Sequence, residues 1–466
     1  MKIAILGFAR ENKSVLAFLR KSPTYKKAEF WILDRNPKLQ IRPNVPKGTR
    51  IITGENYLKN LSEFDLVFRT PGVPYNLPEI QRAVKKGVEF SSATKLFFET
   101  IGKMVRRGSP RVIGITGTKG KGTTATLLYK ILKACNKKIY LAGNIGSPPL
   151  GLLKKTMGGP RKSVPIVILE LSSFQLQDLK KSPPIAVVLE IFPDHMDAHK
   201  NMGEYIDAKT NIARYQKKTD KIFYFSDNKW AKWIASKSRG KKIPVQCRDI
   251  GCPDITKILG TSDVQKLIKI PGFHNVRNIL MAATVALSLG CPKEKIIKVI
   301  KNFRGNEHRL ELVRTIRIHS EHSDEFVDSD RIIRFYNDSA STNPQTAAAA
   351  IKSFASPKIL ICGGKDKGLN YSPLAKALKN SNTELIILFG ENKNKIKKAI
   401  SKSGVPIKLV QNLKTAINIT YKYSKFYFLD SKFLNIIFSP ASASFDMFKN
   451  YAERGKKFKE LVRKLK

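Results

Sequence analysis

The chain has 466 residues, enough for roughly two to four domains, and its 42 % hydrophobic and 26 % charged residues are typical of a soluble globular protein. No apolar run approaches the length of a membrane span, which excludes membrane insertion, and five cysteines without metal-ligand spacing predict reduced thiols in the cytoplasm. The formal net charge of +48 comes from lysines spread along the whole chain, so we expect non-specific attraction to polyanions and no specific nucleic-acid site.

Residues 1–103 have the pattern of a small α/β domain. Apolar, β-branched runs at Lys2–Gly7, Phe30–Leu33 and Asp65–Phe68 predict its strands. The turn after the first run has one glycine where a dinucleotide fingerprint needs three, so a mononucleotide or nucleotide-sugar pocket fits better than a redox dinucleotide. The second run ends in a polar cluster, at the edge where such sheets bind ligands, formed by Asp34, Arg35 and Asn36.

A glycine-rich turn between a predicted strand at Val112–Ile115 and a predicted helix from Thr123 is typical of a phosphate-binding loop rather than a purely structural turn. Glycines let backbone N–H groups face an anion, the helix N-terminus adds its dipole, and Lys121 supplies a positive charge. Gly122 stands where a hydroxyl residue normally follows the lysine, so we expect Thr123 to contact Mg²⁺. The expected nucleotide contacts are Gly117, Thr118, Lys119, Gly120, Lys121, Gly122, Thr123 and Thr124.

Two further predicted strands end in residue types that bind metal ions or phosphate. Ile166–Leu169 leads to Glu170, and Ile185–Ile191 leads to the segment FPDHMDAH, which contains His195. Because the carboxyl ends of parallel strands meet at one edge of a sheet, this arrangement suits Mg·ATP chemistry beside the glycine-rich turn. Asn275 stands at the head of a long apolar helix, where it predicts either a helix cap or a contact with a base.

From about residue 310 the pattern predicts a third α/β domain. Its expected strands are Phe335–Tyr336, Lys358–Cys362, Leu385–Phe389, Phe426–Phe428 and Asn435–Phe438. An acidic insertion within Thr315–Phe335 predicts an exposed hairpin. The strand ends carry hydroxyl, amide and cationic side chains, which suit the binding of a carboxylate and a phosphate.

Together these motifs resemble the Mur ligases of bacterial cell-wall synthesis, and two of them, ELSSFQL and SPASASFDMFKNYAERG, resemble the members that add D-glutamate. The other matching motifs are GTKGKGTT, GNIG, DHMD, HNVRN, HR, NDSASTN and GGKDKG, in family order. The resemblance implies an α/β fold of three domains. These are a Rossmann-like UDP-binding domain at residues 1–103, a P-loop ATPase domain at 104–309 and a Rossmann-like domain at 310–466.

The resemblance further implies an ATP-dependent ligase that adds D-glutamate to UDP-N-acetylmuramoyl-L-alanine through an acyl phosphate. We expect a cytoplasmic monomer. The alternatives are a folylpolyglutamate-type ligase, which the GKG sequence favours and the long segment before the P-loop disfavours, and a Mur ligase for another amino acid such as L-glutamate. A basic, catalytically silent protein that binds ATP or nucleic acid is the non-enzyme alternative.

Site residues follow from the matching motifs. Lys121, Glu170, His195 and Lys209 are expected to be catalytic, with Lys209 carrying CO₂ as a carbamate. Two Mg²⁺ ions would be held by Thr123, Glu170, His195 and Lys209. Further contacts with ATP would come from Asn275, Arg309 and Asp338.

The two other substrates are assigned in the same way. Asp34, Arg35 and Asn36 would bind uracil, and Asn144, otherwise only a turn former, would contact the UDP-sugar. The amino acid would be surrounded by Thr342, Lys367, Ser444 and Phe445. Ala340 stands where many relatives have a lysine, so we expect Lys367 to carry most of the glutamate recognition.

Overall fold

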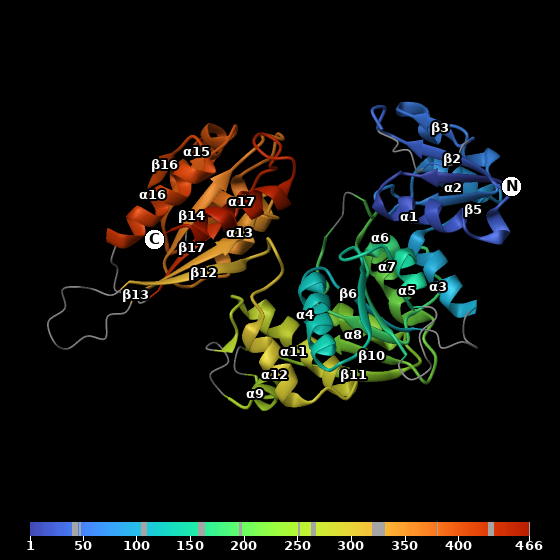
Figure 1. The fold of residues 1–466 in the computed structure, drawn as a ribbon, viewed down its shortest axis with the longest axis horizontal. Coiled ribbons are helices and arrows are strands. Elements are labelled where there is room, and N and C mark those ends of the chain that lie inside the picture. Colours follow the sequence, from blue (N-terminus) through green and yellow to red (C-terminus); the bar gives the residue numbers. More distant parts are fainter. Residues whose placement is uncertain are drawn as a thin grey trace. The chain divides into compact units, whose positions relative to one another are not determined.

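A computed structural model describes residues 1–39, 45, 48–103, 110–156, 164–194, 198–249, 252–261, 267–318, 331–379, 381–426 and 433–465 (Figure 1). These residues form two compact units. The first contains Met1–Arg248, Cys252–Gly260 and Arg277–Val299, and the second contains Thr261–Val276 and Ile300–Lys466. The three domain boundaries expected from the sequence stay a prediction.

The first unit begins with a five-stranded parallel sheet in the order β3-β2-β1-β4-β5. Its strands are β1 (Lys2–Leu6), β2 (Glu29–Asp34), β3 (Arg50–Thr53), β4 (Leu66–Arg69) and β5 (Glu89–Ser91), with helices α1 (Arg10–Leu19), α2 (Pro78–Lys85) and α3 (Ala93–Lys103). β1 is central, and its neighbours β2 and β4 end in Asp34 and Arg69. The carboxyl edge of this sheet therefore carries the polar cluster that the sequence predicts.

The second sheet of this unit has six parallel strands in the order β11-β10-β9-β6-β8-β7. They are β6 (Arg111–Thr116), β7 (Ile139–Gly143), β8 (Ile166–Glu170), β9 (Ile185–Val188), β10 (Lys221–Phe225) and β11 (Lys241–Val245). The helices are α4 (Lys121–Ala134), α5 (Pro149–Thr156), α6 (Ser173–Leu176), α7 (Met202–Arg214), α8 (Lys229–Ser236), α9 (Pro253–Leu259), α11 (Phe273–Ser288) and α12 (Lys293–Asn302). The start of α11, up to Val276, and the end of α12, from Ile300, belong to the second unit. β6 lies between β8 and β9, which places its glycine-rich turn beside the ends of both neighbours.

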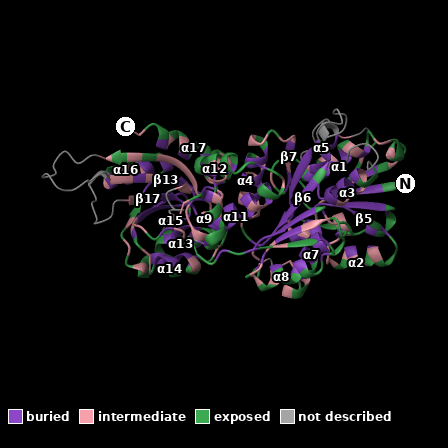
Figure 2. Cartoon of the chain, turned by 90° about the horizontal axis from the view of Figure 1, so that it is seen from below, coloured by how far each residue is buried: buried purple, intermediate pink, exposed green. Residues whose placement is uncertain are grey.

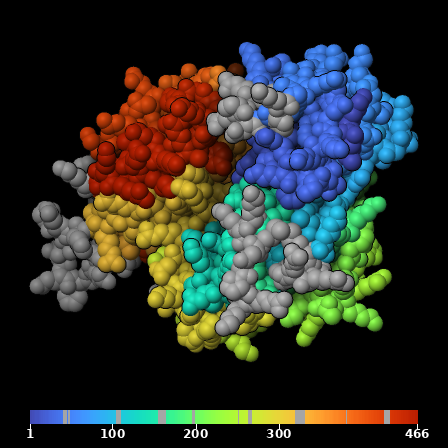
Figure 3. Space-filling view, turned by 45° about the vertical axis from the view of Figure 1, so that its right-hand side comes forward, coloured from blue at the N-terminus to red at the C-terminus, as the bar shows by residue number. Residues whose placement is uncertain are grey.

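The two sheets of the first unit are joined through helices that lie between them. Helix α5 packs on α1 and α3, and the space-filling view shows the blue N-terminal residues continuous with the cyan residues near position 100 (Figure 3). Most of their strands are largely buried (Figure 2), whereas β3 and β11 are mostly exposed or half-buried. All five residues of β8 and all four of β9 are buried. Parallel strands covered on both faces need such continuous apolar runs, which is why the sequence marks them clearly.

The second unit contains a six-stranded sheet in the order β12-β13-β17-β14-β15-β16. Its strands are β12 (Glu311–Ile318), β13 (Arg331–Asn337), β14 (Lys358–Gly363), β15 (Thr383–Phe389), β16 (Ile407–Leu409) and β17 (Phe433–Phe438). The helices are α13 (Pro344–Lys352), α14 (Ser372–Leu378), α15 (Lys393–Ile400), α16 (Leu413–Phe426) and α17 (Tyr451–Arg463). β12 pairs antiparallel with β13, and the other pairings are parallel.

The structure confirms one of three expectations from the sequence and shows that the other two are wrong at particular residues. The expected hairpin is present in the antiparallel pair β12 and β13, while the acidic residues 319–330 lie outside the described residues. The strand expected from Phe426 is wrong at that residue, because Phe426 ends helix α16. The reduced-thiol prediction is wrong for Cys247 and Cys252, which form a disulfide. Among the described residues, no helix combines the length and the apolar character that a membrane crossing requires.

Candidate active site

The turn after β6 is shaped by glycines at which a side chain would collide with neighbouring residues. Gly120 has a φ of +81°, and a Cβ at this position would lie 2.1 Å from Oδ1 of Asn278. A Cβ at Gly117 would lie 2.7 Å from Cβ of Leu189. Helix α4 starts at Lys121, directly after Gly120. The turn therefore lies tightly between α11 and the end of β9, with a helix N-terminus at its end, which is a geometry that favours an anion.

The side chains of this turn have two kinds of role. Lys121 donates hydrogen bonds through Nζ to the carbonyls of Gly117 (2.9 Å) and Thr118 (3.1 Å), so its charge stays over the turn. Thr118 uses its hydroxyl inside the fold, where it accepts a hydrogen bond from the Phe192 N–H (2.9 Å) and shares one with the Tyr205 hydroxyl (3.0 Å). The charge of Lys121 lies over the turn that would hold a phosphate, whereas the Thr118 hydroxyl anchors the turn.

Two of the expected threonines lie at the start of α4. Thr123 is half-buried in the first turn of this helix. Thr124 is buried, and its Oγ1 donates a hydrogen bond to Oδ1 of Asn278 (3.3 Å). The second threonine therefore connects α4 to α11, while the first is the better candidate for a ligand contact.

Lys209 on α7 is 1 % exposed and lies beside the same turn. Its Nζ donates hydrogen bonds to the Gly117 carbonyl (3.1 Å) and to Oγ1 of Thr116 (3.4 Å), and it lies 4.7 Å from the ring centroid of Tyr205. Burial, and after it the nearby charge of Lys121, lowers the pKa of Lys209 well below its ordinary value of 10.5. Its amine therefore favours the neutral, nucleophilic form more than an exposed lysine does.

Glu170, at the end of β8, is 4 % exposed. Its Oε1 accepts a hydrogen bond from Nδ2 of Asn144 (3.4 Å), while Oε2 has no hydrogen-bond partner among the described residues. A buried carboxylate oxygen without a donor is costly unless a cation compensates it. Glu170 therefore has the properties of a metal ligand.

Of the remaining ligand-type residues after β9, Asp194 and His199 lie among the described residues and His195 does not. Asp194 lies near enough to Lys209 to favour its charged form. His199 is buried, shares a hydrogen bond with the Ser173 hydroxyl (3.0 Å) and stacks on Phe174 with ring centroids 5.2 Å apart. Within the described part of the chain, no group of three or more His, Cys, Asp or Glu side chains forms a metal site.

Asp34, Arg35 and Asn36 follow β2 in the first sheet. Asp34 accepts hydrogen bonds from the backbone N–H of Phe8 (2.7 Å) and of Asn36 (2.8 Å), while Arg35 is exposed. The Asp34 carboxylate therefore connects the turn after β1 to the turn after β2. Whether these turns bind uracil stays a prediction.

In the second unit, Asp338 follows β13 and is buried. It accepts hydrogen bonds from the Ser439 hydroxyl (2.7 Å) and from the Leu310 N–H (3.2 Å). Burial raises the pKa of Asp338 to about 7, against the opposing effect of these hydrogen bonds and of the nearby charge of exposed Arg309. Asn275, also in this unit, donates from Nδ2 to the Pro271 carbonyl (2.6 Å), which stabilises the turn before α11.

The residues expected to surround the amino acid lie on the loops after β14 and β17. Lys367 is exposed, and its Nζ lies 5.0 Å from the ring centroid of Phe445, which is 61 % exposed. Ser444 is buried and Thr342 is half-buried. Lys365, the other cation of the loop after β14, instead pairs with Glu391 (2.6 Å). The structure therefore brings Lys367 and Phe445 together on the surface.

Comparison with known proteins identifies the family. Residues 1–92 match the Mur ligase MurD-like N-terminal domain, and residues 115–286 match the Mur ligase middle domain. UDP-N-acetylmuramoylalanine–D-glutamate ligase of Acetivibrio thermocellus is 35 % identical over 488 residues, covering 99 % of this chain and 96 % of that protein. The chain belongs to the Mur ligase family. The protein of the same name from Clostridium tetani is 34 % identical over 486 residues, covering 100 % of this chain and 97 % of that protein.

Solved structures confirm the Mur ligase fold. UDP-N-acetylmuramate–alanine ligase of Thermotoga maritima matches with a TM-score of 0.52 at 18 % identity and covers 99 % of both chains. Folylpolyglutamate synthase of Mycobacterium tuberculosis matches with a TM-score of 0.51 at 14 % identity, covering 78 % of this chain and 94 % of that one. As a Mur ligase, the protein is an ATP-dependent, amide-forming ligase.

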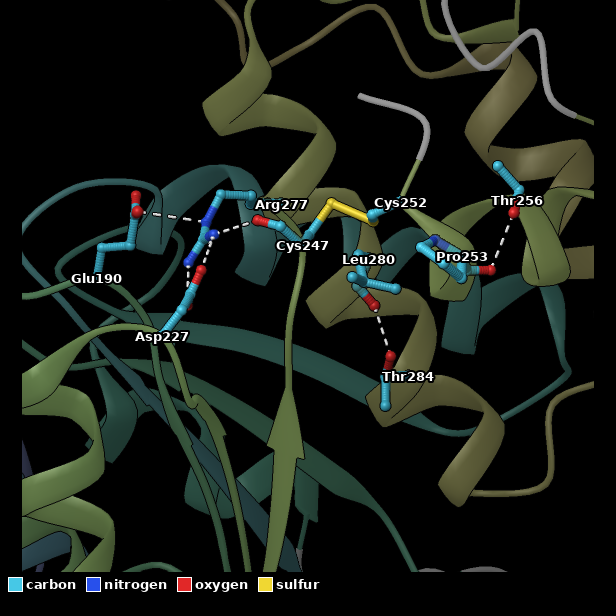
Figure 4. Close-up of a disulfide and its surroundings, with 9 residues drawn as sticks. All are labelled: Glu190, Asp227, Cys247, Cys252, Pro253, Thr256, Arg277, Leu280 and Thr284. Carbon is cyan, nitrogen blue, oxygen red and sulfur yellow. Dashed lines mark hydrogen bonds and ion pairs between the residues drawn. A yellow bond between two sulfur atoms is a disulfide. The ribbon is translucent and has the colours of Figure 1, made fainter. Parts of the chain in front are cut away.

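Sequence reasoning missed a charged cluster beside the turn of this Mur ligase (Figure 4). Arg277 binds Asp227 through two hydrogen bonds (2.6 and 2.8 Å), and its Nε lies 3.2 Å from Oε1 of Glu190. It also donates to the carbonyl of Cys247, one half of the disulfide. The Glu190 carbonyl accepts a hydrogen bond from the Thr118 N–H (2.8 Å), so the cluster supports the glycine-rich turn. No spacing in the sequence connects these residues.

A second residue that sequence reasoning missed is Arg454 on α17, which is fully buried. It donates hydrogen bonds to the carbonyls of Ser339, Ser442 and Ala443 and to the Ser339 hydroxyl, at 2.9–3.1 Å. Arg454 thus connects the loop after β13 with the loop after β17. The motif that contains it was recognised as a block, but its sequence gives no sign that a cation inside it would be buried.

Proposed function

We propose that this protein joins D-glutamate to UDP-N-acetylmuramoylalanine in an ATP-dependent step of peptidoglycan precursor synthesis. The observation that carries this proposal is the similarity, at 35 % identity over 99 % of the chain, to a ligase of that name. The anion-shaped turn after β6 supports ATP as the energy source. The match of residues 1–92 to a MurD-like domain disfavours the folylpolyglutamate alternative.

The chemistry must overcome the poor electrophilicity of a carboxylate. Transfer of the γ-phosphoryl group of ATP to the substrate carboxylate gives an acyl phosphate. The amine of D-glutamate then attacks the acyl carbon, and phosphate leaves from the tetrahedral intermediate. Lys121 is placed over the turn to stabilise charge on the transferring oxygens, and the remaining contribution is positioning.

Mg²⁺ fits the donors that this chain presents. Glu170 has a buried oxygen without a hydrogen-bond donor among the described residues, and Thr123 offers a hydroxyl at the helix start. We propose that Glu170, Thr123 and His195, together with a carbamate on Lys209, hold two Mg²⁺ ions. Bound Mg²⁺ would neutralise charge on the phosphates.

The burial of Lys209 supports its modification. A neutral amine can attack CO₂, forming an N–C bond and releasing one proton, and the carbamate that results is an anion. Lys209→Ala is expected to be nearly inactive, with partial rescue by acetate, because a small carboxylate can replace the missing anion. Full activity in this variant would contradict the role proposed for Lys209.

The substrate residues are part of the same proposal. Asp34, Arg35, Asn36 and Asn144 would contact the UDP-linked substrate. Thr342, Lys367, Ser444 and Phe445 would surround D-glutamate, and Asn275, Arg309 and Asp338 would contact the nucleotide. We place the reaction in the cytoplasm, where ATP is available. The Cys247–Cys252 disulfide would meet cellular reductants there.

The experiment that tests the proposal measures ADP release with ATP, Mg²⁺ and UDP-N-acetylmuramoyl-L-alanine against a panel of amino acids that includes both enantiomers of glutamate. We expect release, and an amide product by mass spectrometry, with D-glutamate. Product with a different amino acid would overturn the D-glutamate assignment and leave the ligase chemistry. Absence of product with every amino acid would overturn both.

A further inference from the structure

Arg10 connects the two sheets of the first unit at one defined point. It is the first residue of α1, and its guanidinium donates one hydrogen bond to the carbonyl of Gly146 (2.9 Å) and another to that of Gly143 (3.2 Å). These carbonyls belong to the turn at residues 143–146 that follows β7. Two donors held in a rigid plane reach two acceptors of one turn, which is a geometry that arginine provides and lysine does not.

The turn that Arg10 holds is tightly fitted against the end of β8. A Cβ at Gly143 would lie 2.3 Å from the Glu170 carbonyl oxygen, and a Cβ at Gly146 would lie 2.4 Å from that of Leu141. Between these glycines stands Asn144, whose N–H donates to the Glu170 carbonyl (3.1 Å) and whose Nδ2 donates to the Glu170 carboxylate (3.4 Å). The turn therefore places an exposed amide next to the buried carboxylate.

We propose that Arg10 is a positioning residue for the UDP-linked substrate, acting by fixing the turn that carries Asn144. This inference rests on the proposed function, which assigns the UDP-sugar contact to Asn144. The guanidinium donates to two neutral backbone carbonyls of this turn, so its contribution is to fix the orientation of the turn and of Asn144 on it.

A purely structural role is disfavoured because other contacts already join the two sheets. Gln175 donates to Glu11 (2.7 Å) in a buried position, and Arg69 donates to the Phe174 carbonyl (3.2 Å) in a partly buried one. Arg10, by contrast, is exposed and can be removed without opening the core. Its loss is therefore expected to loosen one turn rather than the whole unit.

The test compares Arg10→Ala, Arg10→Lys and, as a matched control, Arg20→Ala at the other end of α1. Loss of two charge-assisted hydrogen bonds is expected to raise the KM for UDP-N-acetylmuramoyl-L-alanine by about tenfold in Arg10→Ala. The KM for ATP and the kcat should stay near parent values, because Arg10 orients only the turn that carries Asn144. A folding defect would instead lower the kcat for all substrates alike. The KM of Arg10→Lys for UDP-N-acetylmuramoyl-L-alanine should lie between the KM of the parent and that of Arg10→Ala, since a lysine amine can reach one of the two carbonyls.

A double-mutant cycle with Asn144→Ala decides whether Arg10 acts through this side chain. If it does, Arg10→Ala adds no further increase in KM to the Asn144→Ala variant. Additive effects, an unchanged KM in Arg10→Ala, or an equal increase in Arg20→Ala would overturn the proposal while the parent enzyme remains an active ligase. A parent enzyme that turns over no UDP-linked substrate would overturn the proposed function, and this inference with it.

Discussion

The buried charges beside the glycine-rich turn of the first unit and those at the strand ends of the second unit differ in how far groups of the protein satisfy them. In the first unit, Arg277 is paired with Asp227, but Glu170 keeps one carboxylate oxygen without a donor among the described residues. The Nζ of buried Lys209 donates to a carbonyl and a hydroxyl and lies near the Tyr205 ring, and burial lowers its pKa. In the second unit, Asp338 receives a hydrogen bond at each carboxylate oxygen, and all three guanidinium nitrogens of Arg454 donate.

This difference indicates which unit is prepared for chemistry. A buried charge that lacks a partner costs free energy and is retained where a ligand compensates it. A buried charge whose hydrogen bonds are all made within the protein instead fixes the conformation of the loops that it connects. The first unit therefore has the electrostatic character of a site for phosphate and metal. The second unit uses its buried charges to fix two loops, and it offers the exposed Lys367 and Phe445 for recognition.

The largest expected effect comes from removing the charge over the glycine-rich turn. Lys121→Ala should reduce the rate of ADP release by about 10³-fold, because the transferring phosphoryl group loses a preorganised cation. Fold and stability should change little, because Lys121 is only half-buried and its removal leaves the core intact. Lys133→Ala, near the other end of α4, is the matched control and should keep the parent rate. A parent-like rate in Lys121→Ala would contradict the role of the first unit.

The buried acid of the second unit should be visible in the pH dependence of stability. Because the pKa of Asp338 rises from 3.8 to about 7 on folding, the folded state binds more protons between these values. The contribution of Asp338 to stability is therefore fully present below pH 3.8 and is lost as the pH rises through about 7. Asp338→Asn cannot ionise, so it should gain about 2–3 kcal/mol relative to the parent between pH 5 and pH 8. Urea unfolding of the parent and of Asp338→Asn across this pH range measures the difference in their free energies of unfolding. If that difference does not change with pH, the Asp338 carboxyl is solvated in the folded protein and the prediction is wrong.

The smallest expected effect concerns recognition of the amino acid. Lys367→Ala should raise the KM for D-glutamate by about tenfold and leave the KM for ATP unchanged, because one cation–carboxylate contact is lost. Lys365→Ala is the matched control, since this lysine already pairs with Glu391. Ala340→Lys should be tolerated or tighten binding of glutamate. Steady-state kinetics with D-glutamate and ATP varied separately measure both KM values. If Lys367 binds the nucleotide instead, the KM for ATP would rise and the KM for D-glutamate would not.

The sequence was sufficient where the physical signal is local. Continuous apolar runs predicted β1, β6 and β8 within one or two residues, because strands buried on both faces need them. The glycine-rich turn was predicted from its composition, and the structure places both Lys121 and Lys209 on the Gly117 carbonyl. Lys209 itself was found through family resemblance, because a lysine within a helix has no local mark of burial.

The sequence was insufficient where partners come from distant segments. The partners of Arg277 are Asp227, Glu190 and the Cys247 carbonyl, which lie at no recognisable spacing from it. The disulfide was missed for a different reason, because a separation of five residues matches no common cysteine motif. The strand expected at Phe426 failed because an aromatic run at the end of a helix reads like a short strand.

The most direct test of the division between the two units is to trap the acyl phosphate with borohydride when no amino acid is present. Enzyme, ATP, Mg²⁺ and UDP-N-acetylmuramoyl-L-alanine are mixed, and the reduced alcohol is measured by mass spectrometry. We predict that Lys367→Ala forms the trapped product as the parent does, and that Lys121→Ala forms none. Trapped product from Lys121→Ala, or its loss in Lys367→Ala, would contradict the assignment of chemistry to the first unit and recognition to the second.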